Sequence, residues 1–128
     1  MLALALAVAA AAPAIAQSAR SIESIGVSFD FPDGSAKRTT VTADEVEALT
    51  GQRPAYKLLP WVHAALRKLE ISHKSSPEKG GGIALTEIAG VANGPRGRWV
   101  YAVNGVASPY QLNTQTIEGV NQIAFSYR

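Results

Sequence analysis

The clearest alternation of apolar and polar positions lies between Gly97 and Gly105. Trp99 and Tyr101 stand two positions apart in a run of aromatic and β-branched residues, which is the period of a strand with two different faces. The run ends at Asn104-Gly105, a pair that accepts the positive φ angles of a tight turn. We therefore expect a strand inside a sheet, with both aromatic rings anchoring the core.

A second alternating pattern runs from Ile25 to Phe31, where apolar residues occupy every other position. Residues 32–34 follow with Pro-Asp-Gly, in which proline presets φ and glycine takes the positive-φ corner of a turn. The chain then returns over residues 37–42, with Thr39 and Val41 on one face. These features predict a β-hairpin at the start of the fold.

A short helix is predicted to follow this hairpin. Asp44 is followed three residues later by Glu47, which is similar to a capping box and places acids in the first turn. Gly51 then ends the pattern, so the helix has only two turns.

A longer helix is predicted from Leu58 or Pro60 to Ile71, with the proline in its first turn. Its apolar residues recur at spacings of three and four and form one stripe: Leu58, Leu59, Val62, Ala65, Leu66 and Leu69. Trp61 and His63 fall off the centre of this stripe, and we expect His63 at the boundary between core and solvent.

The rest of the chain contains two further strand patterns separated by turn-rich segments. Residues 72–82 are polar and end in three glycines, which predicts a mobile loop. Residues 83–88 and 121–128 are expected to be strands. Residues 90–97 are dense in turn formers, and residues 110–119 are expected to form a surface loop.

The N-terminal residues have the composition of a secretory signal. Residues 1–16 carry no charged side chain and end in Ala14-Ile15-Ala16, a small-x-small site of the kind that signal peptidase cuts. The apolar run is shorter than the roughly 20 residues of a membrane-spanning helix, so an uncleaved anchor is the second choice. We expect a signal peptide over residues 1–16, one domain over residues 17–128, and a secreted or periplasmic location.

Charge and cysteine content exclude several classes of protein. The 128 residues include twelve Lys and Arg against ten Asp and Glu, and this slight excess does not indicate a nucleic-acid partner. The chain has no cysteine, so a disulfide framework, a thiolate metal site and a cysteine nucleophile are all excluded. After signal cleavage, no membrane partner is expected.

The order of elements is strand, strand, helix, strand, strand, strand. A hairpin, a crossover helix and a terminal strand predict an α+β fold with a mixed sheet of about five strands and one main helix packed across it. This is the β-grasp, or ubiquitin-like, arrangement.

Three segments resemble motifs of the family of domains similar to the transcobalamin C-terminal domain. They are residues 88–94 (Ile-Ala-Gly-Val-Ala-Asn-Gly), 99–105 (Trp-Val-Tyr-Ala-Val-Asn-Gly) and 123–127 (Ile-Ala-Phe-Ser-Tyr). That family shows an Ile-x-Gly strand, a Trp-x-Tyr-x-Val-Asn-Gly strand and an ending of the form Gly-Asp-x-Ile-x-x-x-Tyr. This chain departs from it at residues 118–123, where Gly-Asp is absent before the last strand, so we expect a remodelled last turn.

The resemblance implies a fold and a general role. In the cobalamin carriers, this domain closes over a corrinoid that is held against a separate helical barrel. No such barrel is predicted here, so the resemblance implies the β-grasp fold and an extracytoplasmic binding role, with a cobalamin cofactor as an alternative.

The favoured function is therefore a non-enzymatic binding or adaptor domain for a small molecule or a protein partner. The candidate ligand-binding residues are Trp99, Tyr101, Asn104 and Tyr110. The rings of Trp99 and Tyr101 have an alternative role as core anchors, and Asn104 has one as a turn residue. The alternative functions are a corrinoid-binding domain and an accessory domain of an envelope assembly, and the oligomeric state stays open.

A hydrolytic enzyme is the least favoured class, and we expect neither catalytic residues nor metal ligands. The sequence has no serine nucleophile elbow. No second ligand stands three or four residues from His63, which excludes a zinc pair on one helix. If the fold brought His63 and His73 within metal-sharing distance, an enzyme would regain support.

Overall fold

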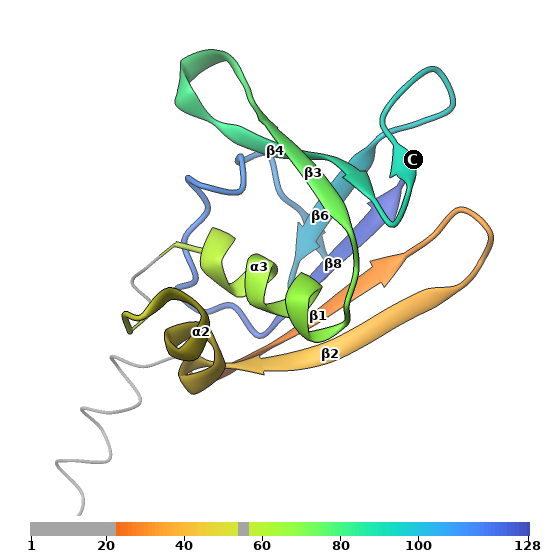
Figure 1. Ribbon diagram of the computed structural model, residues 1–128. Coiled ribbons are helices and arrows are strands. Elements are labelled where there is room, and N and C mark those ends of the chain that lie inside the picture. The colour runs from red at the N-terminus through yellow and green to blue at the C-terminus, as the bar shows by residue number, and fades with distance from the viewer. Residues whose placement is uncertain (1–22, 54–56) are drawn as a thin grey trace, which may run out of the picture.

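The computed structural model describes residues 23–53 and 57–128, so the predicted signal peptide lies outside the described residues. Within those ranges the chain forms two α-helices and eight strands in two sheets (Figure 1). In chain order the elements are β1 (Ser24–Asp30), β2 (Ala36–Thr42), α2 (Ala43–Thr50), α3 (Leu59–Lys68), β3 (His73–Pro77), the 3₁₀ turn η1 (Lys79–Gly81), β4 (Ile83–Ile88), β5 (Val91–Ala92), β6 (Trp99–Val103), β7 (Val106–Ala107) and β8 (Gln122–Tyr127). The predicted α+β class is confirmed.

The larger sheet is mixed and has the strand order β2-β1-β8-β6-β7. The two central strands, β1 and β8, pair in parallel, and the other pairs are antiparallel. Phe29 of β1 lies beside Phe125 of β8 with their rings stacked 5.1 Å apart. The first and last strands of the described chain therefore meet at the centre of the core.

The predicted N-terminal hairpin is confirmed as β1 and β2, with full pairing from Ser24–Thr42 to Asp30–Ala36. In the turn, the Asp33 carboxylate accepts hydrogen bonds from the Ser35 amide at 2.9 Å and from its hydroxyl at 2.6 Å. Gly34 has φ = 90°, the conformation for which the turn needs a glycine.

Helix α2 is capped by Thr42, two residues before Asp44, where the sequence pattern places its start. Thr42 is the N-cap: its hydroxyl accepts a hydrogen bond from the Glu45 amide, and the Glu45 carboxylate accepts one from the Thr42 amide. This is a complete capping box, whereas Asp44 lies inside the first turn. Because Thr42 is also the last residue of β2, one residue ends the strand and starts the helix.

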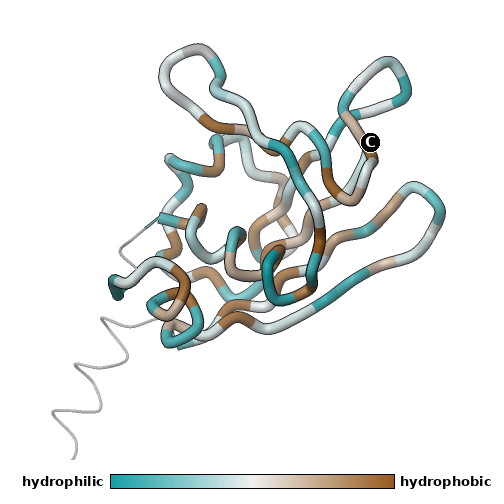
Figure 2. The backbone as a smooth tube through the Cα atoms, viewed as in Figure 1, coloured by the Kyte–Doolittle hydropathy of each residue, from teal (hydrophilic) through white to brown (hydrophobic). Residues whose placement is uncertain are grey.

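Helix α3 ends at Lys68, and Glu70 adopts φ = 55°, which reverses the chain earlier than the predicted end at Ile71. Trp61, which the pattern places off the centre of the apolar stripe, is fully buried. The reason is that α3 packs against α2 as well as against β1 and β2, so its buried surface is wider than one stripe. Figure 2 shows the apolar segments gathered between α3 and the sheets, with hydrophilic residues on the outer loops.

The second sheet has the order β3-β4-β5 and corrects the prediction of a loop over residues 72–82. Strand β3 is polar and largely exposed, but its backbone pairs with β4 from His73–Ile88 to Pro77–Ile83. Backbone pairing and polar contacts hold this strand against β4, so it has no apolar period to detect. Leu85 and Ile88 of β4 are buried and connect the small sheet to the common core.

The predicted strands over residues 83–88, 99–103 and 121–128 are confirmed as β4, β6 and β8. The segment between β7 and β8 is irregular as expected, but it is not only a surface loop. Leu112, Ile117 and Val120 are all buried, so this segment covers part of the core. None of the helices within the described residues has the length and hydropathy that crossing a bilayer requires.

Candidate functional site

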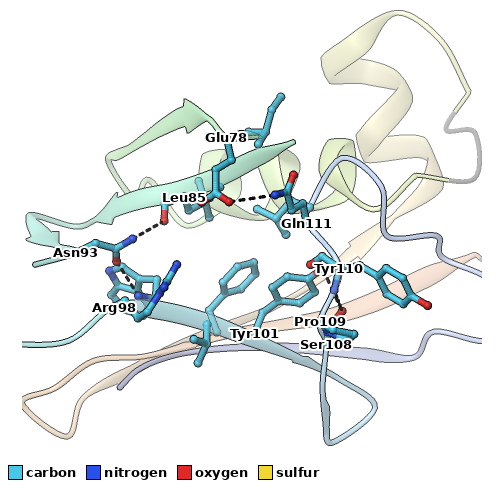
Figure 3. Close-up of a pocket in the computed structure, with 15 residues that line it drawn as sticks. Glu78, Leu85, Asn93, Arg98, Tyr101, Ser108, Pro109, Tyr110 and Gln111 are labelled. Atoms are coloured by element: carbon cyan, nitrogen blue, oxygen red, sulfur yellow. Dashed lines mark hydrogen bonds between the residues drawn. The ribbon is translucent and has the colours of Figure 1, made fainter. Parts of the chain in front are cut away.

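A cavity of ≈ 360 Å³ lies between the larger sheet, strand β4 and the segment that follows β7 (Figure 3). Most of its lining is apolar or aromatic: Ile83, Ala84, Leu85, Trp99, Val100, Tyr101, Pro109, Tyr110, Leu112 and Phe125. The polar groups that line it are Glu78, Asn93, Arg98, Ser108 and Gln111. The cavity is therefore of mixed character, with aromatic and apolar side chains beside polar groups. Its volume lies at the lower end of the range of about 300–1,000 Å³ that small-molecule sites occupy.

Trp99 is held rigidly in the wall of this cavity. Its indole Nε1–H donates to the Val91 carbonyl oxygen at 2.8 Å, which links β6 to the short strand β5. The ring lies edge-on to Phe31 at 5.6 Å and to Tyr127 at 5.5 Å, and the residue is 6% exposed. Trp99 therefore packs in the core, as one prediction had it, and also lines the cavity in which the other prediction would place a ligand.

Tyr101 lies on the same face of β6, with its ring 5.5 Å from that of Phe125. Its hydroxyl donates to the Tyr110 carbonyl oxygen at 2.5 Å and lies 3.2 Å from the Ser108 Oγ. Burial raises the pKa of the Tyr101 phenol above its usual value, with the Ser108 hydrogen bond acting in the opposite direction. The group therefore stays protonated at neutral pH and acts as a fixed donor that ties the loop after β7 to β6.

Tyr110 belongs to the outer edge of the cavity lining and is 62% exposed. Figure 3 shows its ring on the outer side of the segment after β7, directed away from Tyr101 and from Asn93 and Arg98 at the other end of the cavity. Val106 on β7 is also strongly exposed, although it does not line the cavity.

Asn104 lies outside the cavity and is engaged elsewhere. It has φ = 50° in the turn between β6 and β7, and Gly105 follows with φ = 84°. Its Nδ2 donates to the Gly119 carbonyl at 2.8 Å, and its Oδ1 accepts from the amides of Asn121 at 2.8 Å and Gln122 at 3.0 Å. Of the four predicted residues, the structure therefore brings Trp99, Tyr101 and Tyr110 to one cavity. Asn104 stays in the β6–β7 turn, where its side chain bonds the chain that leads into β8.

One end of the cavity is closed by contacts between the β3–β4 hairpin and the segment after β7. Gln111 Nε2 donates to the Glu78 carboxylate at 3.0 Å. Asn113 accepts from the Ile83 amide at 2.9 Å and donates to the Gly81 carbonyl at 2.9 Å. A Cβ at Gly82 would lie 0.8 Å from the Gln111 Oε1, so a glycine makes room for this side chain.

Sequence reasoning missed these closing contacts, although one signal was present. Three consecutive glycines at residues 80–82 predict flexibility, but glycine also marks a place where another group approaches the backbone closely. Gly82 is such a place. Its neighbour, Gln111, lies 29 positions away in the sequence, so no local pattern indicates which residue approaches it.

A second pocket of ≈ 530 Å³ shares no lining residue with the first. It is formed by the end of α2, one side of α3 and the chain that leads into β3: Leu49, Thr50, Leu59, Pro60, His63, Arg67, Ile71 and His73. The imidazole centres of His63 and His73 lie 5.7 Å apart. Burial, and then the proximity of His73, lower the pKa of the His63 imidazole below its usual value. The proximity of the two rings was not predicted, because they come from different elements.

No known sequence family matches the chain, and no curated protein is similar to it at a significant level. Several solved structures have a related fold, and two of them are described here. One is a Ruminococcus gnavus ATCC 29149 protein that is proposed to bind metal. It has a TM-score of 0.59 and 10% identity over 84% of this chain and 97% of that one. The other is haptocorrin in complex with Cbi, with a TM-score of 0.56 and 14% identity over 84% of this chain.

These likenesses concern the fold alone, because the identities are low. The matched region is 26% of the haptocorrin chain, so this protein spans only about a quarter of haptocorrin's length. A relation to the fold of a transcobalamin-family protein is therefore supported, whereas membership of a family is not.

Proposed function

We propose that this protein is an exported, non-enzymatic binding domain of β-grasp arrangement that holds a small molecule in the cavity beside Trp99, Tyr101 and Tyr110. The observation that carries the proposal is the cavity itself, which combines an aromatic wall with polar groups at its edge. Of the two solved structures described above, one is a protein proposed to bind metal and the other is in complex with Cbi, and this supports a binding role.

The cavity volume limits the kind of ligand. A space of ≈ 360 Å³ accommodates a small compound or one projecting part of a larger one. A corrinoid is the specific alternative, and it would have to bind through one edge, with the rest of the molecule in solvent or against a partner. Haptocorrin has nearly three quarters of its chain outside the region matched here, so corrinoid binding by this domain alone is a distinct claim.

Groups that line the cavity support binding rather than catalysis. The Ser108 hydroxyl donates to the Gln115 side-chain oxygen at 2.6 Å, so it is not paired with a base as a nucleophile would be. The Tyr101 hydroxyl is already used as a donor to the backbone. The histidine pair, which would favour an enzyme, lies in a pocket whose lining has no carboxylate to act as a general base.

A second candidate function is that of an accessory domain that docks another protein. It is favoured by the exposure of Val106, which is 71% exposed on the short edge strand β7, close in sequence to Tyr110 at 62%. Edge strands and exposed apolar side chains are common docking features.

The test titrates the full chain with dicyanocobinamide and with cyanocobalamin, following the melting temperature. A ligand that binds the native state raises this temperature in a saturable manner. Tyr110→Ala should weaken the effect by about tenfold, equivalent to ~1.4 kcal/mol, because the exposed ring supplies contact area at the outer edge of the cavity. Val106→Ala is the matched control and should leave the titration unchanged.

Flat curves with both corrinoids would reject the corrinoid alternative. If a Val106→Ala change instead abolished association with a co-purifying protein while Tyr110→Ala did not, the accessory role would replace the small-molecule role. Export is checked by the intact mass of the mature protein, which should begin at Gln17.

A further inference from the structure

The pocket between α2, α3 and the start of β3 contains a pair of histidines that the proposed function does not use. His63 projects from α3, and His73 is the first residue of β3. The chain reverses between them: Glu70 takes φ = 55°, and the Ile71 amide donates back to the Leu66 carbonyl at 2.9 Å. This reversal returns the chain along α3 and brings the two rings to 5.7 Å, centre to centre, with 31° between their planes.

Both rings have a nitrogen that can bind a metal ion. His73 Nδ1 lies 3.5 Å from the Ile71 carbonyl oxygen, and a proton on Nδ1 donated to that carbonyl leaves the lone pair of Nε2 free. His63 is half-buried, and none of the described residues forms a hydrogen bond with its ring. Metal–nitrogen bonds of about 2.0–2.1 Å place two imidazoles that share one ion roughly 5–6 Å apart, centre to centre.

We propose that His63 and His73 form a two-ligand site for a divalent transition-metal ion that prefers imidazole nitrogen, with Cu²⁺ bound more tightly than Zn²⁺ or Ni²⁺. Imidazole suits these ions, whereas Mg²⁺ and Ca²⁺ require oxygen ligands. The order of affinity follows from the general preference of nitrogen sites for Cu²⁺ over its neighbours.

The surroundings define what kind of metal site this is. Within residues 23–53 and 57–128 there is no group of three or more His, Asp or Glu side chains that could hold a metal. The ion therefore keeps open coordination positions, which face a pocket lined by Leu49, Leu59 and Ile71. Arg67 lines the same pocket, and its positive charge opposes a bound cation.

The test uses the full chain without a histidine tag and Cu²⁺ as the probe. Calorimetric titration should give one ion per chain, and either His63→Asn or His73→Asn should weaken binding by about tenfold or more. The electron paramagnetic resonance spectrum should show coupling to two imidazole nitrogens in the wild type and to one in each variant. Melting temperatures without metal confirm that the variants fold.

Arg67→Gln separates a cation site from an anion site formed by the same three basic side chains. Removing the guanidinium tightens Cu²⁺ binding if the pocket holds a cation, because a repulsive charge is lost. Unchanged Cu²⁺ affinity in both asparagine variants, or binding of inorganic phosphate that Arg67→Gln abolishes while Cu²⁺ does not bind, would overturn the proposal. This result is independent of the corrinoid titration, since the two pockets share no residue.

Discussion

At the scale of single residues, Asn104 shows how a motif residue can serve the fold rather than the ligand. Its backbone occupies a left-handed conformation, and its side chain makes three hydrogen bonds to residues 119–122. These bonds tie the β6–β7 turn to the entry of β8, the strand at the centre of the larger sheet. The asparagine of the Val-Asn-Gly motif is therefore explained by its role in holding the turn against the start of β8, and no ligand contact is needed to account for it.

Asn104→Ala should destabilise the protein by about 1–3 kcal/mol, because it removes three hydrogen bonds. The alanine would also occupy a left-handed backbone conformation, which is strained for a residue with a Cβ atom, and would lack the side-chain bonds that offset this strain. Asn104→Gly loses the same bonds but relieves the backbone, so its loss should be smaller. Chemical denaturation of both variants measures the two contributions. Equal stability of the wild type and Asn104→Ala would show that the turn is held by other contacts.

Gly82 offers a second test at this scale, since its φ of −75° is open to alanine and only the Gln111 side chain stands in the way. Gly82→Ala should displace Gln111 from Glu78 with a loss of less than ~1 kcal/mol, because a flexible side chain can move. Gln111→Ala should have a similar effect, and the double variant should be no worse than either single one. Additive losses would contradict a shared contact.

At the scale of elements, the start of α2 couples a capping box to an ion pair. Glu45 accepts from the Thr42 amide at 3.0 Å, and its carboxylate lies 2.9 Å from the Lys68 ammonium of α3. The hydrogen bond from Lys68, followed by that from the Thr42 amide, lowers the pKa of the Glu45 carboxyl below its ordinary value of 4.5. One side chain thus joins β2, α2 and α3.

The sign of the pH dependence follows from this lowered pKa. A carboxyl group with a lower pKa in the folded state stabilises the fold above the unfolded value, and the contribution disappears as the pH falls through the folded value. The difference in unfolding free energy between the wild type and Glu45→Gln should be complete above pH 4.5 and vanish at lower pH. Thr42→Ala removes the hydroxyl that accepts from the Glu45 amide and donates to the Glu45 carboxylate, so it should cost about 1 kcal/mol near neutral pH and keep part of that cost at low pH. A difference between wild type and Glu45→Gln that does not vary with pH would contradict the assigned ion pair.

The same scale separates what the sequence could predict from what it could not. Strands β1, β4, β6 and β8 were predictable, because alternation of apolar residues and the turn residues that end two of them are local signals. Strand β3 was not, since it is exposed and is specified by pairing with β4. The closing contacts of the cavity and the histidine pair were also inaccessible, because Gln111 meets Gly82 and His63 meets His73 only after distant elements pack.

At the scale of the whole molecule, α3 packs on one face of the larger sheet, and the β3–β4 hairpin extends beside it (Figure 1). One pocket lies between the sheets and the other lies along the helices, so the two candidate sites are built from different contacts. The aromatic cavity is central to the proposed function, and its wall residues Trp99 and Phe125 also belong to the core. Ligand binding there should therefore raise global stability.

The most direct measurement is native mass spectrometry of the protein purified without unfolding from the cells that produce it, as wild type, Tyr110→Ala and Val106→Ala. A domain that holds its ligand at the aromatic cavity should carry one small-molecule adduct in the wild type and in Val106→Ala, and a reduced amount in Tyr110→Ala. Bare protein in all three samples, or an adduct that Tyr110→Ala retains in full, would contradict a ligand site beside Trp99 and Tyr101.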